Sequence, residues 1–62
     1  GKIKTAIAAD DMLKGSDISV TTANGVVTLT GTAKTQDQVS VATGIAQKQE
    51  GVTRVDANVT VQ

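Results

Sequence analysis

The spacing of apolar residues divides the chain into helical and extended segments. Apolar side chains recur about every 3.6 positions where a helix buries one face, and every second position where a strand does. The helical spacing occurs in residues 2–13 and 35–50, and the alternating spacing in residues 17–31 and 52–61. The predicted order is therefore helix, strand, strand, helix, strand, with a tight turn between the first two strands.

The dipeptide Asn24-Gly25 is the strongest turn signal in the chain, because both central positions of a two-residue hairpin turn favour a positive φ. A turn at this place pairs Val20 with Leu29 across the hairpin. The same register puts four aliphatic side chains on one face, namely Ile18, Val20, Val27 and Leu29. The turn and the hydrophobic pattern thus predict the same pairing, and the opposite face carries serine and threonine.

Two helices are predicted to flank the hairpin. Residues 2–13 form the first, which is rich in alanine. The second begins at Thr35, which makes a capping box with Gln38, and ends with Gly51 as a left-handed terminator. We expect Gly44 to allow close packing of this helix on the sheet. Its buried stripe is predicted to consist of Val39, Ala42, Ile45 and Ala46.

The last segment, residues 52–61, is predicted to be a half-buried strand. A strand, a crossover helix and a strand form a right-handed unit with parallel strands, so the sheet should be mixed, three-stranded and ordered as in the sequence. Both helices then cover the aliphatic face, and the threonine-rich face meets solvent or a partner. The predicted fold is α+β, with two layers in the order αββαβ. The inward side chains of the last strand are Val55, Ala57, Val59 and Val61.

Composition excludes several classes of function. The chain has no Cys, His, Phe, Trp or Tyr, so it lacks a thiolate nucleophile, the usual general base and the aromatic platforms on which RNA stacks. Six basic and six acidic residues give a net charge of +0, whereas nucleic-acid-binding domains are normally basic. We therefore expect no nucleic-acid partner. No apolar run is long enough to span a bilayer.

The remaining polar groups are explained without catalysis. The aspartates in residues 10–17 and Asp56 lack the spacing of a calcium-binding loop, so solvated carboxylates are the better interpretation. Serine and threonine hydroxyls have no histidine to activate them. The glycines form no phosphate-binding loop, and those expected to have structural roles are Gly25, Gly31 and Gly51. We predict no enzyme activity, no cofactor and no metal site.

Four short motifs together cover most of the chain. They are Asp17-Ile18-x-Val20, Asn24-Gly25-Val26-Val27-Thr28-Leu29-Thr30-Gly31, Ile45-Ala46 and Gly51-Val52-x-x-Val55. Together they resemble the BON domain, a module of bacterial envelope and osmotic-stress proteins. The resemblance implies the same αββαβ fold that the hydrophobic pattern predicts. Two positions depart from the family pattern, since Gln49 falls in the middle of the apolar stripe and Val41 stands where the family is usually polar.

The resemblance also implies a function. It implies a non-enzymatic module of the bacterial periplasm that associates with phospholipid membranes and is linked to osmotic-stress protection. Its other implied partners are a second BON domain or another envelope protein. We expect residues 1–62 to be one domain cut from a longer protein, in which such domains commonly stand in tandem. Two alternatives stay open, namely a protein-docking domain that acts through its sheet face and an ion-sensing BON module.

Lys2 and Lys4, near the start of the first helix, are the candidate contact with lipid phosphates. They are the paired cations that lie closest together in the sequence, and two charges would give weak, salt-sensitive attraction to an anionic surface. The alternative interpretation, in which both lysines are the solvated end of a domain, stays open at this level. The family resemblance implies no catalytic residue in this chain.

Overall fold

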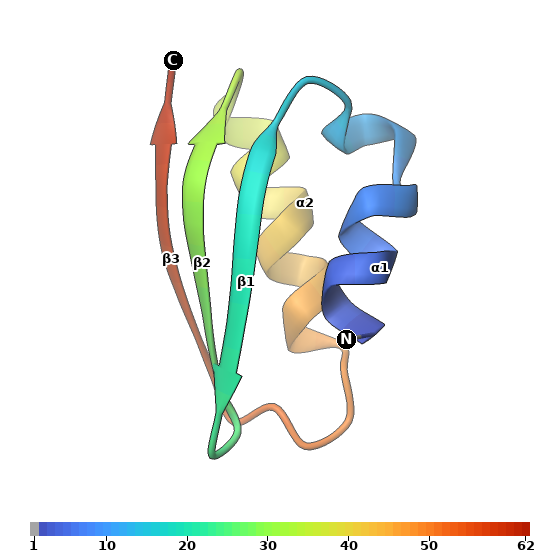
Figure 1. Cartoon of the computed structure of the whole chain (residues 1–62), viewed down its shortest axis with the longest axis vertical. Coiled ribbons are helices and arrows are strands. Elements are labelled where there is room, and N and C mark those ends of the chain that lie inside the picture. The colour runs from blue at the N-terminus through green and yellow to red at the C-terminus, as the bar shows by residue number, and fades with distance from the viewer. Residues whose placement is uncertain (1) are drawn as a thin grey trace.

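The computed structural model describes residues 2–62 and contains two layers (Figure 1). The elements are α1 (Lys2–Ala9), a short 3-10 helix η1 (Asp11–Leu13), β1 (Asp17–Ala23), β2 (Val26–Ala33), α2 (Gln36–Gln47) and β3 (Arg54–Val61). The strands form one sheet in the order β1-β2-β3, in which β1 and β2 are antiparallel and β2 and β3 are parallel. Both helices lie on the same side of the sheet (Figure 1), so the predicted two-layer α+β fold is confirmed.

The hairpin has the predicted turn and register. Asn24 and Gly25 have φ values of 52° and 79°, as a two-residue turn that matches the strand twist requires. Val20 lies opposite Leu29, which confirms the pairing. The inner face of the hairpin therefore carries its aliphatic side chains, and the outer face carries hydroxyl groups.

The core lies between the inner face of the sheet and the two helices. Val27 and Leu29, on the central strand, have no exposed surface, and the small side chains Ala42 and Ala46 of α2 are equally buried. The other members of this cluster are Ile3, Ile7 and Leu13. Because no aromatic side chain is available, burial depends on close approach of small aliphatic groups. The predicted stripe of α2 is confirmed, with Ile45 half-buried at its flank.

The inward pattern of β3 is only partly confirmed. Val55 and Val59 pack against the core as predicted. Ala57 lies exposed, and Val61 is 42% exposed. The reason is that β3 is the edge strand of the sheet, and within residues 2–62 neither helix extends beyond it (Figure 1).

The prediction of one helix over residues 2–13 is wrong at its end. α1 stops at Ala9, and Asp10 has extended backbone angles of φ −85° and ψ 121°. The carboxylate of Asp10 accepts a hydrogen bond from the backbone N–H of Met12 at 2.9 Å, and so caps the separate 3-10 helix. This break turns the chain so that Leu13 still reaches the core, where it is only 5% exposed.

α2 begins after the predicted cap Thr35, but only half of the predicted capping box forms, because the Gln38 side chain bonds the N–H of Lys34 rather than that of Thr35. The Thr35 hydroxyl accepts from the Gln38 N–H at 3.2 Å. The Gln38 side-chain oxygen accepts from the Lys34 N–H at 2.7 Å, and its amide donates to the carbonyl oxygens of Met12 at 3.1 Å and Lys14 at 2.9 Å. Gln38 is 7% exposed, so this buried amide joins the start of α2 to the segment around η1.

The C-terminal half of α2 differs from prediction. The helix ends at Gln47, and Gly51, with a φ of +86°, lies in the turn that follows rather than directly at the helix end. A Cβ atom at Gly44 would have no neighbour within 4 Å. The expectation that Gly44 allows close packing on the sheet is therefore wrong, because this glycine faces open space.

Gly31 is the glycine at which a side chain fits least. It lies in β2 opposite Ile18 and has a φ of +118°. A Cβ atom at this position would overlap the backbone carbonyl oxygen of Asp17 on the neighbouring strand. β1 and β2 can therefore keep their register at this end only with glycine here.

Gly31→Ala should lower the free energy of unfolding by about 2–4 kcal/mol, since it combines an unfavourable φ with a backbone overlap. Gly44→Ala is the matched control and should raise it by about 0.5–1 kcal/mol, because alanine favours helix and meets no atom there. Urea unfolding followed by circular dichroism measures both. Equal effects of the two substitutions would contradict this account of Gly31.

Gln38→Leu should lower the free energy of unfolding by about 2–4 kcal/mol, because it removes three part-buried hydrogen bonds to backbone groups. The exposed residue Gln36, also in the first turn of α2, provides the control. Gln36→Leu should change stability by less than about 0.5 kcal/mol. Thermal and urea unfolding measure the stability of both variants. If Gln38→Leu were as stable as the unsubstituted chain, the hydrogen bonds of Gln38 would not be what holds η1 to α2.

Candidate functional site

A groove of about 480 Å³ opens at the end of the fold where three segments meet. These are the first turn of α1, the hairpin tip between β1 and β2, and the loop between α2 and β3, all at the lower end in Figure 1. The volume lies within the range of about 300–1,000 Å³ that is typical of small-molecule sites. Residues from each segment line the groove, among them Lys2, Lys4, Val20, Gly25, Gln49 and Val52.

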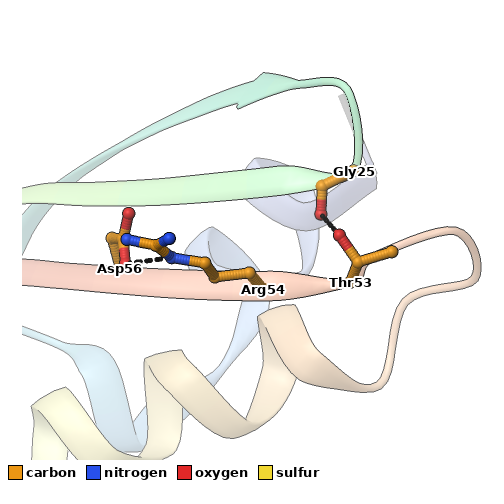
Figure 2. A network of polar contacts seen from close by, with 4 residues as sticks. All are labelled: Gly25, Thr53, Arg54 and Asp56. Atoms are coloured by element: carbon orange, nitrogen blue, oxygen red, sulfur yellow. Dashed lines mark hydrogen bonds and ion pairs between the residues drawn. The ribbon is translucent and has the colours of Figure 1, made fainter.

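The carbonyl oxygen of Gly25 connects the hairpin tip to the loop before β3, beside the groove. This oxygen accepts hydrogen bonds from the Thr53 N–H at 2.7 Å, the Thr53 hydroxyl at 3.2 Å and the Arg54 N–H at 3.3 Å. Figure 2 shows the Thr53 hydroxyl pointing toward this carbonyl. A Cβ atom at Gly25 would lie 3.0 Å from the Gly51 carbonyl oxygen and from the Thr53 hydroxyl. The hairpin tip and the loop before β3 are therefore in close contact, and the loop has a defined position beside the groove.

The structure brings the two predicted lysines to the groove. Lys2 and Lys4 are exposed on α1, and both line it together with the apolar side chains of Ile3 and Val52. Glu50 is the acidic residue in the lining, so the local balance is positive. Lysine side chains and a partly apolar wall are the kinds of group that bind a phosphate or carboxylate attached to an apolar body.

Gln49 is placed differently from the prediction. It lies beyond the end of α2 rather than in the middle of the apolar stripe, and it is half-buried. Its side-chain amide donates to the carbonyl oxygen of Ile45 at 3.3 Å. The placement of Gln49 in the stripe assumed that the helix continues to this residue, and the helix end at Gln47 makes that placement wrong. Gln49 and Thr22 are lining residues that sequence reasoning missed, because their place depends on how the loop packs against the hairpin.

A second cavity, of about 290 Å³, lies between α1, η1 and the start of β1. Its lining contains Lys4 and Lys14 together with Asp10 and Asp17. These opposite charges balance, so this lining has no net charge, unlike that of the first groove.

Two ion pairs lie away from the first groove. Arg54 Nε and Asp56 Oδ1 are 2.9 Å apart on the open face of the sheet (Figure 2). This hydrogen bond and the charge of Asp56 raise the pKa of Arg54 above its usual value. Lys14 and Asp11 form a longer, exposed pair at 3.7 Å. Exposed pairs of this kind contribute little to stability.

Two kinds of feature are absent from residues 2–62. Within this part of the chain, no three acidic, histidine or cysteine side chains gather in a group that could hold a metal ion. No helix in the same range combines the length and the apolar character needed to cross a membrane.

Gly25→Ala should lower the free energy of unfolding by about 2–3 kcal/mol, through its positive φ and its contact with the loop before β3. Gly51→Ala is the control, because Gly51 has a similar φ of +86° but no atom within 4 Å of a Cβ position. It should lower stability by only about 1–2 kcal/mol. The difference between the two, measured by urea unfolding, reports the contact between turn and loop, and no difference would contradict that contact.

Comparison with known proteins identifies the family. The sequence profile of the BON domain matches residues 1–62. Over 54 residues the chain is 44% identical to osmotically-inducible protein Y of Escherichia coli (strain K12), and the match covers 87% of this chain and 27% of that protein. The chain thus spans little more than a quarter of the length of this relative. With the profile match over its whole length, and with the αββαβ fold and the hairpin glycines in place, the chain belongs to the BON domain family.

Proposed function

We propose that this BON domain is a non-enzymatic module of the bacterial envelope that binds anionic phospholipid at the groove. The ammonium groups of Lys2 and Lys4 bind the lipid phosphate. The apolar lining residues Ile3, Val20 and Val52 contact the glycerol and the first carbons of the acyl chains.

One observation carries this proposal, namely that two exposed lysines and a partly apolar wall line the same groove. The net charge of +0 gives no general attraction to an anionic surface, so the attraction must come from a local group of cations. A lysine near an anionic membrane contributes about 1 kcal/mol. Two of them contribute about 2 kcal/mol, which alone corresponds to a dissociation constant of about 30 mM, so binding should be weak and millimolar at best.

The comparisons support the cellular role. The BON family and osmotically-inducible protein Y are not enzyme families, and the name of this relative connects it with osmotic stress. We infer an envelope-associated, periplasmic module that takes part in the response to osmotic stress. Because the match covers 27% of the relative, other parts of a longer chain can add contacts, and a second copy in tandem would raise the apparent affinity through effective concentration.

Lys2→Glu combined with Lys4→Glu should reduce binding to vesicles of phosphatidylglycerol and phosphatidylcholine at least about tenfold, because two attractive charges become repulsive. Co-sedimentation at low ionic strength measures the bound fraction. Binding of the unsubstituted chain should also fall as salt rises, since the screening length falls from about 10 Å at 0.1 M to about 3 Å at 1 M.

The control variant combines Lys14→Glu with Lys34→Glu, which changes the net charge by the same amount. Both residues are exposed, and neither lines the first groove. Lys14 lines the second cavity, whose charges balance. Circular dichroism checks that both variants fold. The control should keep most of the binding. Equal loss in both variants, or binding that is indifferent to salt, would contradict a specific role for Lys2 and Lys4.

A further inference from the structure

β3 forms one edge of the sheet, and within residues 2–62 no strand pairs with its outer side. It is eight residues long, and the chain contains no proline that would interrupt pairing. Figure 1 shows β3 as the outermost strand, with neither helix beyond it. Natural edge strands are usually protected by prolines, bulges or charges that point inward. β3 carries its charged side chains, Arg54 and Asp56, on the open face of the sheet instead.

The backbone groups of β3 alternate in direction. The N–H of Arg54 donates to Gly25 at 3.3 Å, and the N–H of Gln62 donates to Ala33 at 2.8 Å. Even-numbered residues of this strand therefore face β2. Because consecutive residues of a strand point their N–H and C=O groups to opposite sides, the odd-numbered residues direct theirs to the free edge. These residues are Val55, Ala57, Val59 and Val61.

The side chains at this edge leave room for another strand. Ala57 is exposed although it lies on the helix side, and Val61 is 42% exposed. α2 therefore does not close over the edge. A strand added here would cover apolar surface that the chain itself leaves in water.

We propose that β3 pairs with β3 of a second copy of this chain in an antiparallel ladder whose two-fold axis passes beside Asn58. In this register Val55 faces Val61 of the second copy, and Ala57 faces Val59 of the second copy. Every outward-facing backbone group from Val55 to Val61 then gains a partner. The result is a continuous six-stranded sheet with the helices of both copies on one side.

The open face fits the same register. Asn58 lies beside Asn58 of the second copy, and each carboxamide can donate to the other. Asp56 lies opposite Thr60 of the second copy. Its Oδ1 already accepts from Arg54, and its Oδ2 is placed to accept from the threonine hydroxyl. No like charges face one another, and like charges directly opposite would weaken the pairing.

The neighbouring registers are less favourable. A two-fold axis at Ala57 would pair Val61 with Thr53, whose N–H is already bonded to Gly25. An axis at Asp56 would place two aspartates directly opposite each other. The strand edge therefore favours the axis at Asn58. Since pairing of one edge buries less area than the roughly 1,200 Å² of a stable interface, the dimer should be weak and depend on concentration.

Charge substitutions at the proposed axis test this register. Asn58→Lys and Asn58→Glu should each raise the dissociation constant of the dimer about fivefold or more, because like charges face each other, and an equimolar mixture of the two should restore association. Sedimentation velocity over a concentration series measures this. Ser19→Lys and Ser19→Glu are the controls, since Ser19 lies exposed on the same face of β1 at the other edge. They should leave association unchanged.

Hydrogen exchange gives a second readout. The amides of Val55, Ala57 and Val59 should become protected as concentration rises, whereas the amide of Asn58, which faces β2, should not change. A chain that stays monomeric at all concentrations would overturn the proposal. So would association that is insensitive to charge at Asn58, or concentration-dependent protection of Ile18 and Val20 on β1 instead.

Discussion

The fold depends on burying one face of a three-stranded sheet with small aliphatic side chains. Val27 and Leu29 occupy the centre of this layer on β2 and are completely buried. Because the chain has no aromatic residue, no large side chain can bridge a wide gap between layers. The helix α2 therefore approaches the sheet through Ala42 and Ala46, which are also fully buried.

The candidate site follows from how little of the sheet two short helices can cover. α2 ends at Gln47, and the loop that follows turns back to the carbonyl oxygen of Gly25. This leaves the hairpin end of the sheet uncovered beside the first turn of α1. The exposed edge of β3 has the same origin, because neither helix extends beyond it. The groove and the free edge are thus both surfaces that a thin core leaves open.

Sequence reasoning succeeded where local rules and the hydrophobic pattern agreed. Asn24-Gly25 specifies a two-residue turn. A register shifted by one residue would have exposed Leu29, so only one pairing of the two hairpin strands agreed with the hydrophobic pattern. Thr35 was recognisable as a helix cap for the same local reason. These features depend on neighbours in sequence or on a period of two, which the chain displays directly.

The features that sequence reasoning missed depend on tertiary contacts. Asp10 breaks the first helix because its carboxylate caps η1, and the alanine-rich segment does not reveal this. Gln38 looks like an ordinary capping residue until its amide is seen to reach Met12 and Lys14. The sequence does not distinguish Gly44 from Gly31. A Cβ atom at Gly44 would meet empty space, whereas one at Gly31 would overlap the neighbouring strand. Gln49 joins the groove only because the helix ends before it.

The proposed function of this domain is to bind anionic lipid in the groove at the hairpin end. The most direct test is a titration of the chain with a short-chain phosphatidylglycerol below its micelle concentration, followed through the backbone amide chemical shifts. Lipid bound in the groove should give the largest shifts at Ile3, Val20 and Val52, which line it, and small shifts at Thr30 on the open face. Shifts concentrated on the open face of the sheet, or none at any lipid concentration, would contradict it.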